Sequence, residues 1–427
     1  MRPFLFLTLL LISCIDLLCF NEAFACSMYK VTIDDKTMVG CNHDTWNQTP
    51  RIWFETESYG ACFTGARPVG ENNFAPQSGM NEFGLAFSRL DAATPLQDDL
   101  SANKKQIVNP TEYLKDILHK CRNVEEVKIY VDQYDRSIFI HDVFIYVDRS
   151  GKYLIVEPYI TTMANDPQYV LANFCPSQIK DFNSIKQTRY INGTTFLKNK
   201  LDTSLRFCRE LSDTMHVCRQ KIGDGTLLTS IWDLKETTTY LYFYHDYEHM
   251  VQFNLKEELA KGDHILDITT LFPPNKEFEK LASFKTPLNS FLVDRFLRFC
   301  LVLFLFLSFY YLYTYFRKAK SLPYSNIKVG LFLLSSLMSY YIFVLATKIN
   351  IYYFPAPYQE QDFSLVNVLS FIPFLLLLLL IPLLRFNRKL FREKSWTMIS
   401  TWILTLNNLV FIALLFLFFY WGFYDIF

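Results

Sequence analysis

The 427-residue sequence lacks the short motifs that carry several common chemistries. It contains no glycine-rich phosphate loop, no Gly-x-Ser-x-Gly nucleophile motif and no His-Glu-x-x-His zinc motif. Its ten cysteines include no Cys-x-x-Cys pair, and its seven histidines are not spaced like metal ligands. Basic and acidic residues number 42 each, so no excess of positive charge indicates a nucleic-acid partner. We therefore expect no metal, no other cofactor and no nucleic acid.

Long apolar runs are missing between Cys26 and Ser290, a stretch with the composition of a globular α/β domain. The composition changes near Phe291, and four apolar runs follow. Each approaches the ~20 residues that a helix needs to cross a bilayer. We therefore predict a membrane domain over 291–427 with four transmembrane helices, at Phe299–Phe316, Val329–Thr347, Phe363–Leu384 and Trp396–Trp421.

Two connections between these runs, Arg317–Lys328 and Arg385–Lys394, are rich in lysine and arginine. Cytoplasmic connections of membrane proteins carry such an excess of basic residues. We therefore expect a multi-pass protein of the cell membrane, with the globular domain and the C-terminus extracytoplasmic. The runs contain almost no ionisable residue, which favours an anchor or assembly module over a transporter.

Residues 1–25 have the features of a signal peptide. Arg2 precedes an apolar segment, Phe4–Phe20, and Ala23-Phe24-Ala25 is a small-x-small cleavage sequence. Cleavage directly after it would make Cys26 the first residue of the mature chain. The free α-amine, with a pKa of ~7.7–8, would then accept the proton of the thiol on the same residue. Cys26 is therefore a candidate self-activating nucleophile.

Other interpretations of this region stay open. Leu11-Ile12-Ser13-Cys14 is the better match to a lipobox, and processing there would produce a lipoprotein with an internal Cys26. Cys26 could also be a disulfide partner. Export permits disulfides among the cysteines from Cys41 to Cys218 as well, but the sequence does not indicate how they pair.

Hydrophobic patterns predict an α+β fold for the globular domain. Strands come first, helices follow, and a meander of strands closes the domain, which suggests antiparallel sheets faced by helices. The main predicted elements are the hairpin of Met28–Ile33 with Thr37–Cys41, helices over 109–121, 124–133 and 204–218, the hairpin of Val143–Val147 with Tyr153–Val156, and the strands of 227–253.

Five segments share the order and approximate spacing of one enzyme family. They are Cys26 at the predicted new N-terminus, Gly40-x-Asn42-x-Asp44, Gly79-Met80-Asn81-Glu82-x-Gly84-Leu85, Val170-Leu171-x-Asn173 and Arg189-Tyr190. The sequence resembles the linear amide C–N hydrolases, the choloylglycine hydrolase and penicillin V acylase family of N-terminal nucleophile hydrolases. The resemblance covers Cys26 to about Leu259 and implies a four-layer αββα domain over 26–290.

The resemblance implies four catalytic residues. Cys26 would attack an amide carbonyl and form an acyl-thioester that water hydrolyses. Asp44 would hydrogen-bond the free amine, and Asn173 would donate to the oxyanion. Arg189 would keep the site electropositive and favour thiolate. The plain alternatives are a turn aspartate, a strand-end asparagine and a surface arginine at the end of a helix.

Two weaker candidates and one departure accompany these residues. Asp91 lies near the position where some relatives place a second oxyanion residue, although a carboxylate hosts an anion poorly unless it is protonated. Asn81 fits the turn scaffold and is at most a weak oxyanion candidate. Cys41 stands where the family commonly has arginine, which removes a cation and is expected to place a second thiol near Cys26.

We therefore expect a membrane-anchored extracytoplasmic amidase that hydrolyses the linear amide of an N-acylated small molecule. Its partners would be that substrate and the lipid bilayer, and an oligomer is possible. The alternative is a non-catalytic sensor or binding domain of this fold on a membrane module, which the departure at Cys41 keeps open.

Overall fold

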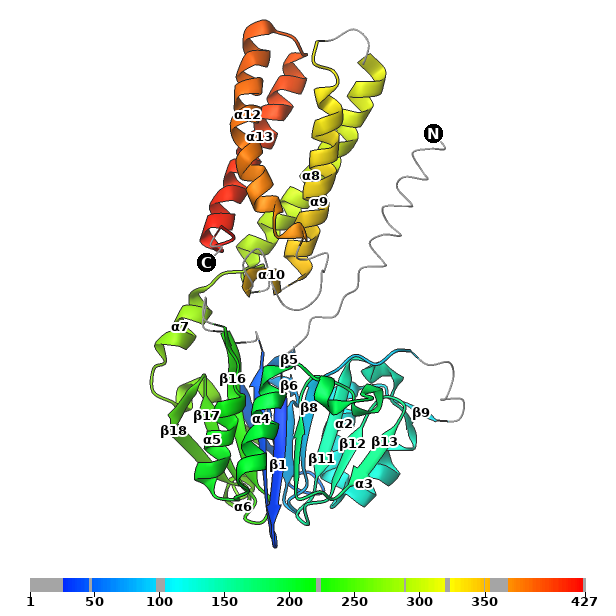
Figure 1. Cartoon of the computed structure of the whole chain (residues 1–427), viewed down its shortest axis with the longest axis vertical. Helices are drawn as coiled ribbons and strands as arrows, with labels where there is room; N and C mark the ends of the chain where they lie inside the picture. The colour runs from blue at the N-terminus through cyan, green and yellow to red at the C-terminus, as the bar shows by residue number, and fades with distance from the viewer. Residues whose placement is uncertain are drawn as a thin grey trace. The chain divides into compact units, whose positions relative to one another are not determined.

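The computed structural model describes residues 26–45, 48–96, 104–219, 224–287, 289–318, 323–348, 350–353 and 368–424. The predicted signal peptide, the alternative processing site at Cys14 and the start of the third apolar run lie outside the described residues. The chain forms two compact units, Met1–Ala282 and Ser283–Phe427 (Figure 1).

One sheet of the first unit has seven antiparallel strands. Their order is β14 (Gln168–Leu171), β1 (Ser27–Ile33), β2 (Lys36–Asp44), β16 (Asp224–Asp233), β17 (Thr238–Phe243) and β18 (Asp246–Asn254), with β15 (Cys218–Arg219) beside β16. The predicted first hairpin is confirmed, and Asp34 takes the left-handed conformation of its tight turn, with a φ of 52°. Ser27 pairs with Asn42, so Cys26 comes next to the end of β2.

The other sheet has eight antiparallel strands. Their order is β13 (Thr161–Ala164), β12 (Tyr153–Val156), β11 (Asp142–Val147), β8 (Ala86–Asp91), β7 (Ser78–Asn81), β4 (Ala61–Gly65), β3 (Arg51–Glu55) and β19 (His264–Asp267). Two small ribbons accompany it, β5 (Arg67–Gly70) with β6 (Asn73–Ala75), and β9 (Lys105–Gln106) with β10 (Tyr134–Asp135).

The prediction that the 227–253 meander closes the domain is wrong. After β18 the chain continues through α6 (Leu255–Leu259) to β19, which pairs with β3 in the eight-stranded sheet, and then to α7 (Lys276–Ser283). The four residues of β19 are too few to show an alternating pattern, so no strand is predicted there from the sequence.

Helices cover one face of each sheet (Figure 1). The helices α2 (Pro110–Lys120) and α3 (Val124–Val131) contact the eight-stranded sheet, whereas α4 (Thr188–Asn199) and α5 (Leu205–Met215) contact the seven-stranded sheet. Each helix pair shares a separate hydrophobic core with its sheet. Polar contacts also join the two sheets, with His43 Nε2 3.0 Å from Ser78 Oγ. The mixed α/β prediction is confirmed.

The starts of α2 and α5 follow from capping. The Asn109 side chain accepts hydrogen bonds from the amides of Thr111 and Glu112, which have no partner inside α2, so the helix begins where the sequence predicts. Ser204 caps α5 in the same way by accepting from the Phe207 amide. The helix α4 begins without a side-chain cap, and Arg189 lies in its first turn, as expected from the start of a helical segment there.

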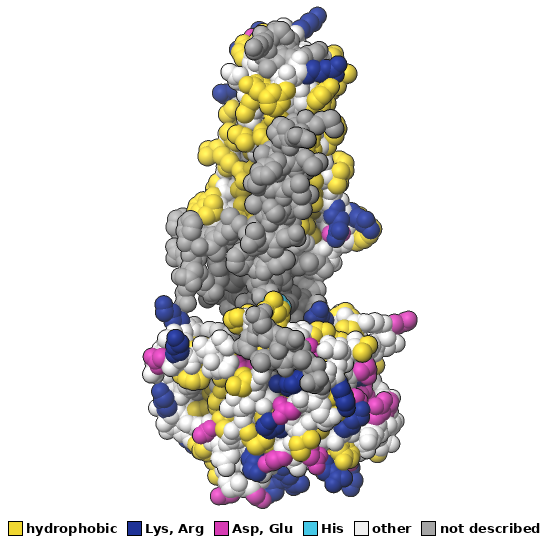
Figure 2. Space-filling view, turned by 90° about the vertical axis from the view of Figure 1, so that its right-hand side faces the viewer, with side chains coloured by type: hydrophobic (Ala, Val, Ile, Leu, Met, Phe, Trp, Pro, Cys, Tyr) yellow, Lys and Arg dark blue, Asp and Glu magenta, His cyan; other side chains and the backbone are white. Residues whose placement is uncertain are grey.

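The second unit is helical, with α8 (Phe291–Lys318), α9 (Ile327–Thr347), α10 (Asn350–Tyr353), α12 (Ile372–Glu393) and α13 (Met398–Tyr420). Each of the four predicted apolar runs overlaps one of the long helices. Among the described residues, only α9 and α13 are long and apolar enough to span a membrane by length and composition. Hydrophobic side chains are spread over the described part of this unit's visible face (Figure 2). Its most exposed hydrophobic residues include Leu378, Ile399 and Phe416, each more than 70% exposed.

The predicted connection Arg385–Lys394 is wrong in part. The helix α12 continues to Glu393, and Lys394 ends it in the left-handed conformation, so most of the basic residues lie on the last turns of a helix. Arginine and lysine are good helix formers, which explains the extension. Pro373 lies in the first turn of α12, where proline is tolerated, whereas Pro382 is inside the helix.

Candidate active site

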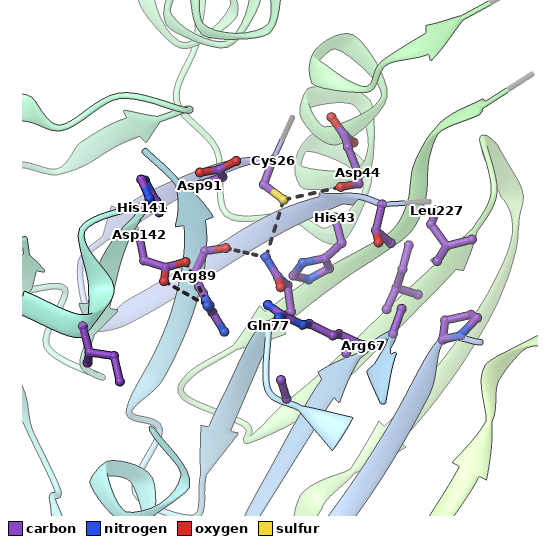
Figure 3. A pocket seen from close by; sticks show the side chains of 17 residues that line it. Cys26, His43, Asp44, Arg67, Gln77, Arg89, Asp91, His141, Asp142 and Leu227 are labelled. Carbon is purple, nitrogen blue, oxygen red and sulfur yellow. Dashed lines mark hydrogen bonds and ion pairs between the residues drawn. The ribbon is translucent and has the colours of Figure 1, made fainter. Parts of the chain in front are cut away.

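Cys26 lies at one wall of a cavity of about 550 Å³ (Figure 3). The cavity is lined by the ends of β2 and β8, by the start of β5 and by residues before β7 and β11. The residue itself is only 3% exposed. Because β1 and β2 are paired, the chain immediately before β1 and the end of β2 lie side by side, which places Asp44 at the same wall.

Two polar groups contact the Cys26 sulfur. The thiol donates to the backbone oxygen of Asp44, 3.8 Å away, and the Gln77 side-chain amide donates to the sulfur at 3.5 Å. The same Gln77 nitrogen donates to the backbone oxygen of Arg89 at 2.7 Å, which fixes its position (Figure 3). A donor aimed at the sulfur stabilises a thiolate more than a thiol. Gln77 therefore has the geometry of a thiolate partner.

In the full-length chain the Cys26 thiol stays protonated at neutral pH. Burial, and then the negative charge of Asp44, raise its pKa to about 12, while the Arg189 charge opposes them. The Cys26 nitrogen is a peptide nitrogen as long as residues 1–25 are attached, so it cannot accept a proton. A reactive thiolate therefore requires a base that the uncut residue does not have.

His43 is a poor candidate for that base. It lines the cavity from β2, but burial lowers its pKa to about 3. Its Nε2 also lies 3.0 Å from Ser78 Oγ and 3.3 Å from Ser230 Oγ, between the two sheets. An imidazole that gains a proton only near pH 3 is a weak acceptor at neutral pH.

Asp44 is held from the neighbouring strand. The hydroxyl of Thr226 on β16 donates to its Oδ1 at 2.6 Å. Thr226 is fixed in turn by Val217, whose amide donates to the hydroxyl at 2.9 Å and whose carbonyl accepts from the Thr226 amide at 2.8 Å. The carboxylate is 4% exposed and next to Cys26, where it could hold a positively charged amine.

Asn173, Arg189 and Asp91 form one hydrogen-bonded group. The Arg189 guanidinium donates to the side-chain oxygen of Asn173, and the Asn173 side-chain amide donates to the backbone oxygen of Asp91 at 2.8 Å. Asp91 lines the cavity, whereas Asn173 and Arg189 do not. The structure thus brings Asp91 to the cavity and places Asn173 behind it, with one of its amide hydrogens used on Asp91.

Asn81 and Cys41 lie outside the cavity lining. The Asn81 side chain donates to the backbone oxygens of Leu118 and Cys121 and accepts from two amides of its own turn, so it ties that turn to the end of α2. Cys41 is fully buried between the sheets, where Ser88 is a hydrogen-bonding neighbour. Asn81 therefore acts in the scaffold, and Cys41 does not line the wall that Cys26 shares.

Sequence reasoning missed several residues of the cavity. Gln77 is one, and Arg89 with its bidentate partner Asp142, at 2.7 and 2.9 Å, is another pair. Arg67 also lines it from the start of β5 (Figure 3). The only available signal was the placement of polar residues beside the Gly79 turn and at the ends of predicted strands.

No disulfide joins the cysteines that the structure describes. Among the described residues, one group of cysteine, histidine and acidic side chains lies close enough to hold a metal ion, namely Cys218, His245 and Glu277. None of its members lines the cavity.

No family model and no curated protein matches the sequence. Among solved structures, the chain is similar to two variants of conjugated bile acid hydrolase from Clostridium perfringens. One is 18% identical with a TM-score of 0.43, over 58% of this chain and 97% of that chain. The other is 18% identical with a TM-score of 0.43, over 59% and 97%. Penicillin V acylase from Agrobacterium tumefaciens is 14% identical with a TM-score of 0.44, over 57% and 91%. At these values the similarity assigns neither a family nor an activity to this chain.

Proposed function

We propose that the chain is an amidase whose nucleophile is Cys26 after removal of residues 1–25. One observation carries the proposal. The residue that directly follows the Ala-Phe-Ala sequence is the one whose sulfur lies at the cavity wall, between Asp44 and the Gln77 amide. Cleavage would place a new amine, the missing base, beside that sulfur.

In the proposed reaction the free amine of Cys26 accepts the thiol proton, and the sulfur attacks the amide carbonyl. The tetrahedral intermediate collapses by breaking the carbon–nitrogen bond, and the leaving nitrogen takes the proton from the ammonium. Water then attacks the thioester carbonyl, giving its proton to the amine. The carbon–sulfur bond breaks, and the sulfur regains a proton.

The neighbouring residues have distinct roles in this scheme. Asp44, oriented by Thr226, holds the amine and stabilises its charged form as the thiol ionises. Gln77 stabilises the thiolate. Asn173 is a candidate donor to the oxyanion through the amide hydrogen not used on Asp91, and Arg189 fixes its orientation.

The substrate class follows from the cavity. A volume of about 550 Å³ is in the range of sites for small molecules. Part of the wall is apolar, from Pro50, Ile138, Leu227 and Leu228, and suits an acyl group. We therefore propose an N-acylated small molecule with a linear amide as the substrate.

We also propose that the second unit anchors the enzyme through four membrane spans, with the first unit extracytoplasmic. The two basic connections lie at the same end of the helical unit, since Trp396 donates to the Pro323 backbone oxygen at 3.0 Å and Lys389 lies 4.6 Å from the Tyr324 ring centre. A single basic end supports a cytoplasmic assignment for that end.

The function is tested with the protein purified from membranes and a panel of N-acyl amides. We expect release of the amine by the processed wild type and none by Cys26→Ser, with an acyl-thioester trapped on the wild type alone. Substrate binding without turnover in a processed, folded protein would instead support a non-catalytic binding domain. Cys41, which stands where arginine is common in the family that the sequence resembles, would agree with that result.

A further inference from the structure

A second group of reactive side chains lies where three segments of the first unit meet. Cys218 comes from β15, His245 from the turn between β17 and β18, and Glu277 from the first turn of α7. One donor atom from each lies within 4.8 Å of the other two. The sequence separations of 27 and 32 residues match no metal motif, so the group exists only in the folded chain.

One pair within the group has the separation of two ligands around a common centre. His245 Nδ1 and Glu277 Oε2 are 3.4 Å apart, which is long for a charge-assisted hydrogen bond. Two donors on one tetrahedral zinc ion are separated by about 3.3 to 3.8 Å, given bonds of about 2.0–2.3 Å. The two side chains form a long direct contact, and the same separation also fits two ligands of one ion.

The surroundings of His245 fit a ligand. Its side chain is only 8% exposed, although the residue lies in a turn. Its buried Nε2 makes no hydrogen bond of ordinary geometry, although the Val217 carbonyl faces the ring. Histidine ligands commonly direct their second nitrogen to a backbone carbonyl.

We propose that Cys218, His245 and Glu277 bind a zinc ion, with water at the fourth position. A thiolate, an imidazole and a carboxylate are the donors that zinc prefers, and three protein ligands with one open position form a recognised type of zinc site. The inference is independent of the proposed amidase function. The ion would fasten β15, the turn after β17 and α7 to one another.

The proposed zinc site also adjoins the hydrogen-bonded residues that hold Asp44. Val217, directly before Cys218, makes two hydrogen bonds with Thr226, and Thr226 donates to Asp44. A metal on Cys218 would therefore stabilise the segment that orients the Asp44 carboxylate, without touching the cavity.

The test uses the full chain, stripped of metal with a chelator and titrated with Zn²⁺ and with Co²⁺ as a spectroscopic probe. We expect about one ion per chain, a thiolate-to-cobalt charge-transfer band, and a higher melting temperature with Zn²⁺. Glu277→Gln removes a ligand and should lower the Zn²⁺ affinity by more than about tenfold. Mutation of a residue that only hydrogen-bonds a ligand already costs about 10- to 100-fold.

The matched control is Glu279→Gln, on the same turn of α7 and also exposed, which should leave the affinity unchanged. Cys218→Ser should remove the charge-transfer band, and its circular dichroism shows whether it folds. Absence of the band in the wild type, or equal Zn²⁺ affinities for Glu277→Gln and Glu279→Gln, would contradict the zinc site. His245 and Glu277 would then be an ion pair, and Cys218 a thiol without a metal-binding role.

Discussion

Cys26 and Cys218 are cysteines of the same unit in opposite surroundings. Cys26 is 3% exposed at a cavity wall, with an amide donor and a carboxylate for neighbours, whereas Cys218 is exposed beside an imidazole and a carboxylate. The first arrangement suits a nucleophile that meets a small molecule, and the second suits a ligand that meets an ion. The neighbours, and not the residue type, decide the chemistry.

A comparison with the core cysteines sharpens this point. Burial raises the pKa of Cys62, Cys121, Cys175 and Cys208 to about 12, the same value as for Cys26. In the uncut chain, therefore, the Cys26 thiol is as inert as a core thiol. Only cleavage after Ala25 would distinguish it, because only Cys26 would gain an amine.

The largest expected effect comes from Cys26→Ser. Loss of the thiolate should lower kcat/KM for an N-acyl amide by roughly 10⁴-fold or more, as for other removed nucleophiles. Release of the amine is followed by chromatography. Cys218→Ser is the comparison variant and should keep most of the activity, so equal losses from both would contradict the division of roles.

Alkylation of the full-length, uncut chain should separate the two thiols, because Cys218 is exposed whereas Cys26 is buried and has a pKa raised to about 12. In the metal-free protein iodoacetamide should modify Cys218 first. The Cys26 rate should rise about tenfold with each pH unit up to about 12, because only the thiolate reacts. Peptide mass spectrometry follows both sites, and fast labelling of Cys26 at neutral pH would refute the inert precursor.

Asp44→Asn should lower kcat by about 10²-fold, a typical loss for a group that assists proton transfer. The amide cannot stabilise the ammonium that forms when the thiol ionises. Asp91→Asn is the comparison variant, since the Asp91 charge also raises the pKa of the Cys26 thiol, but by less than the Asp44 charge does. Steady-state kinetics give kcat for both variants. A larger loss of kcat for Asp91→Asn would contradict the role of Asp44 and assign it to Asp91.

Gln77→Leu should have the smallest effect, a loss of about tenfold in kcat/KM, in line with 1.5–3 kcal/mol for a hydrogen bond to a charged group. The reason is the lost donation to the sulfur. The pH dependence of alkylation in the processed protein measures the effect of this hydrogen bond. The apparent pKa of Cys26 should be higher in Gln77→Leu than in the wild type. An unchanged pKa would make Gln77 a structural residue only.

The sequence predicted the parts of the site that depend on local structure. Cys26 and Asp44 come together because one tight hairpin joins them, and Arg189 lies at the start of α4, where a helix was expected. Gln77 could not be predicted, since its contact with the Cys26 sulfur joins segments of the two different sheets and depends on their packing. Cys218, His245 and Glu277 were missed for the same reason, because no spacing rule links segments that only tertiary packing brings together.

Helix ends and short edge strands account for the errors in the fold. The basic segment after Leu384 fits a connection by charge, but its residues also favour a helix, and α12 extends to Glu393. The strand β19 has no pattern of its own and is defined by pairing with β3.

The central claim is that cleavage creates the active residue. Intact-mass measurement and N-terminal sequencing of the protein purified from membranes test it most directly. The account predicts a chain that begins at Cys26 with an unmodified amine. A chain that begins at Cys14 with a lipid, an uncut N-terminus or a blocked Cys26 would contradict it, because the thiol would then have no base of its own.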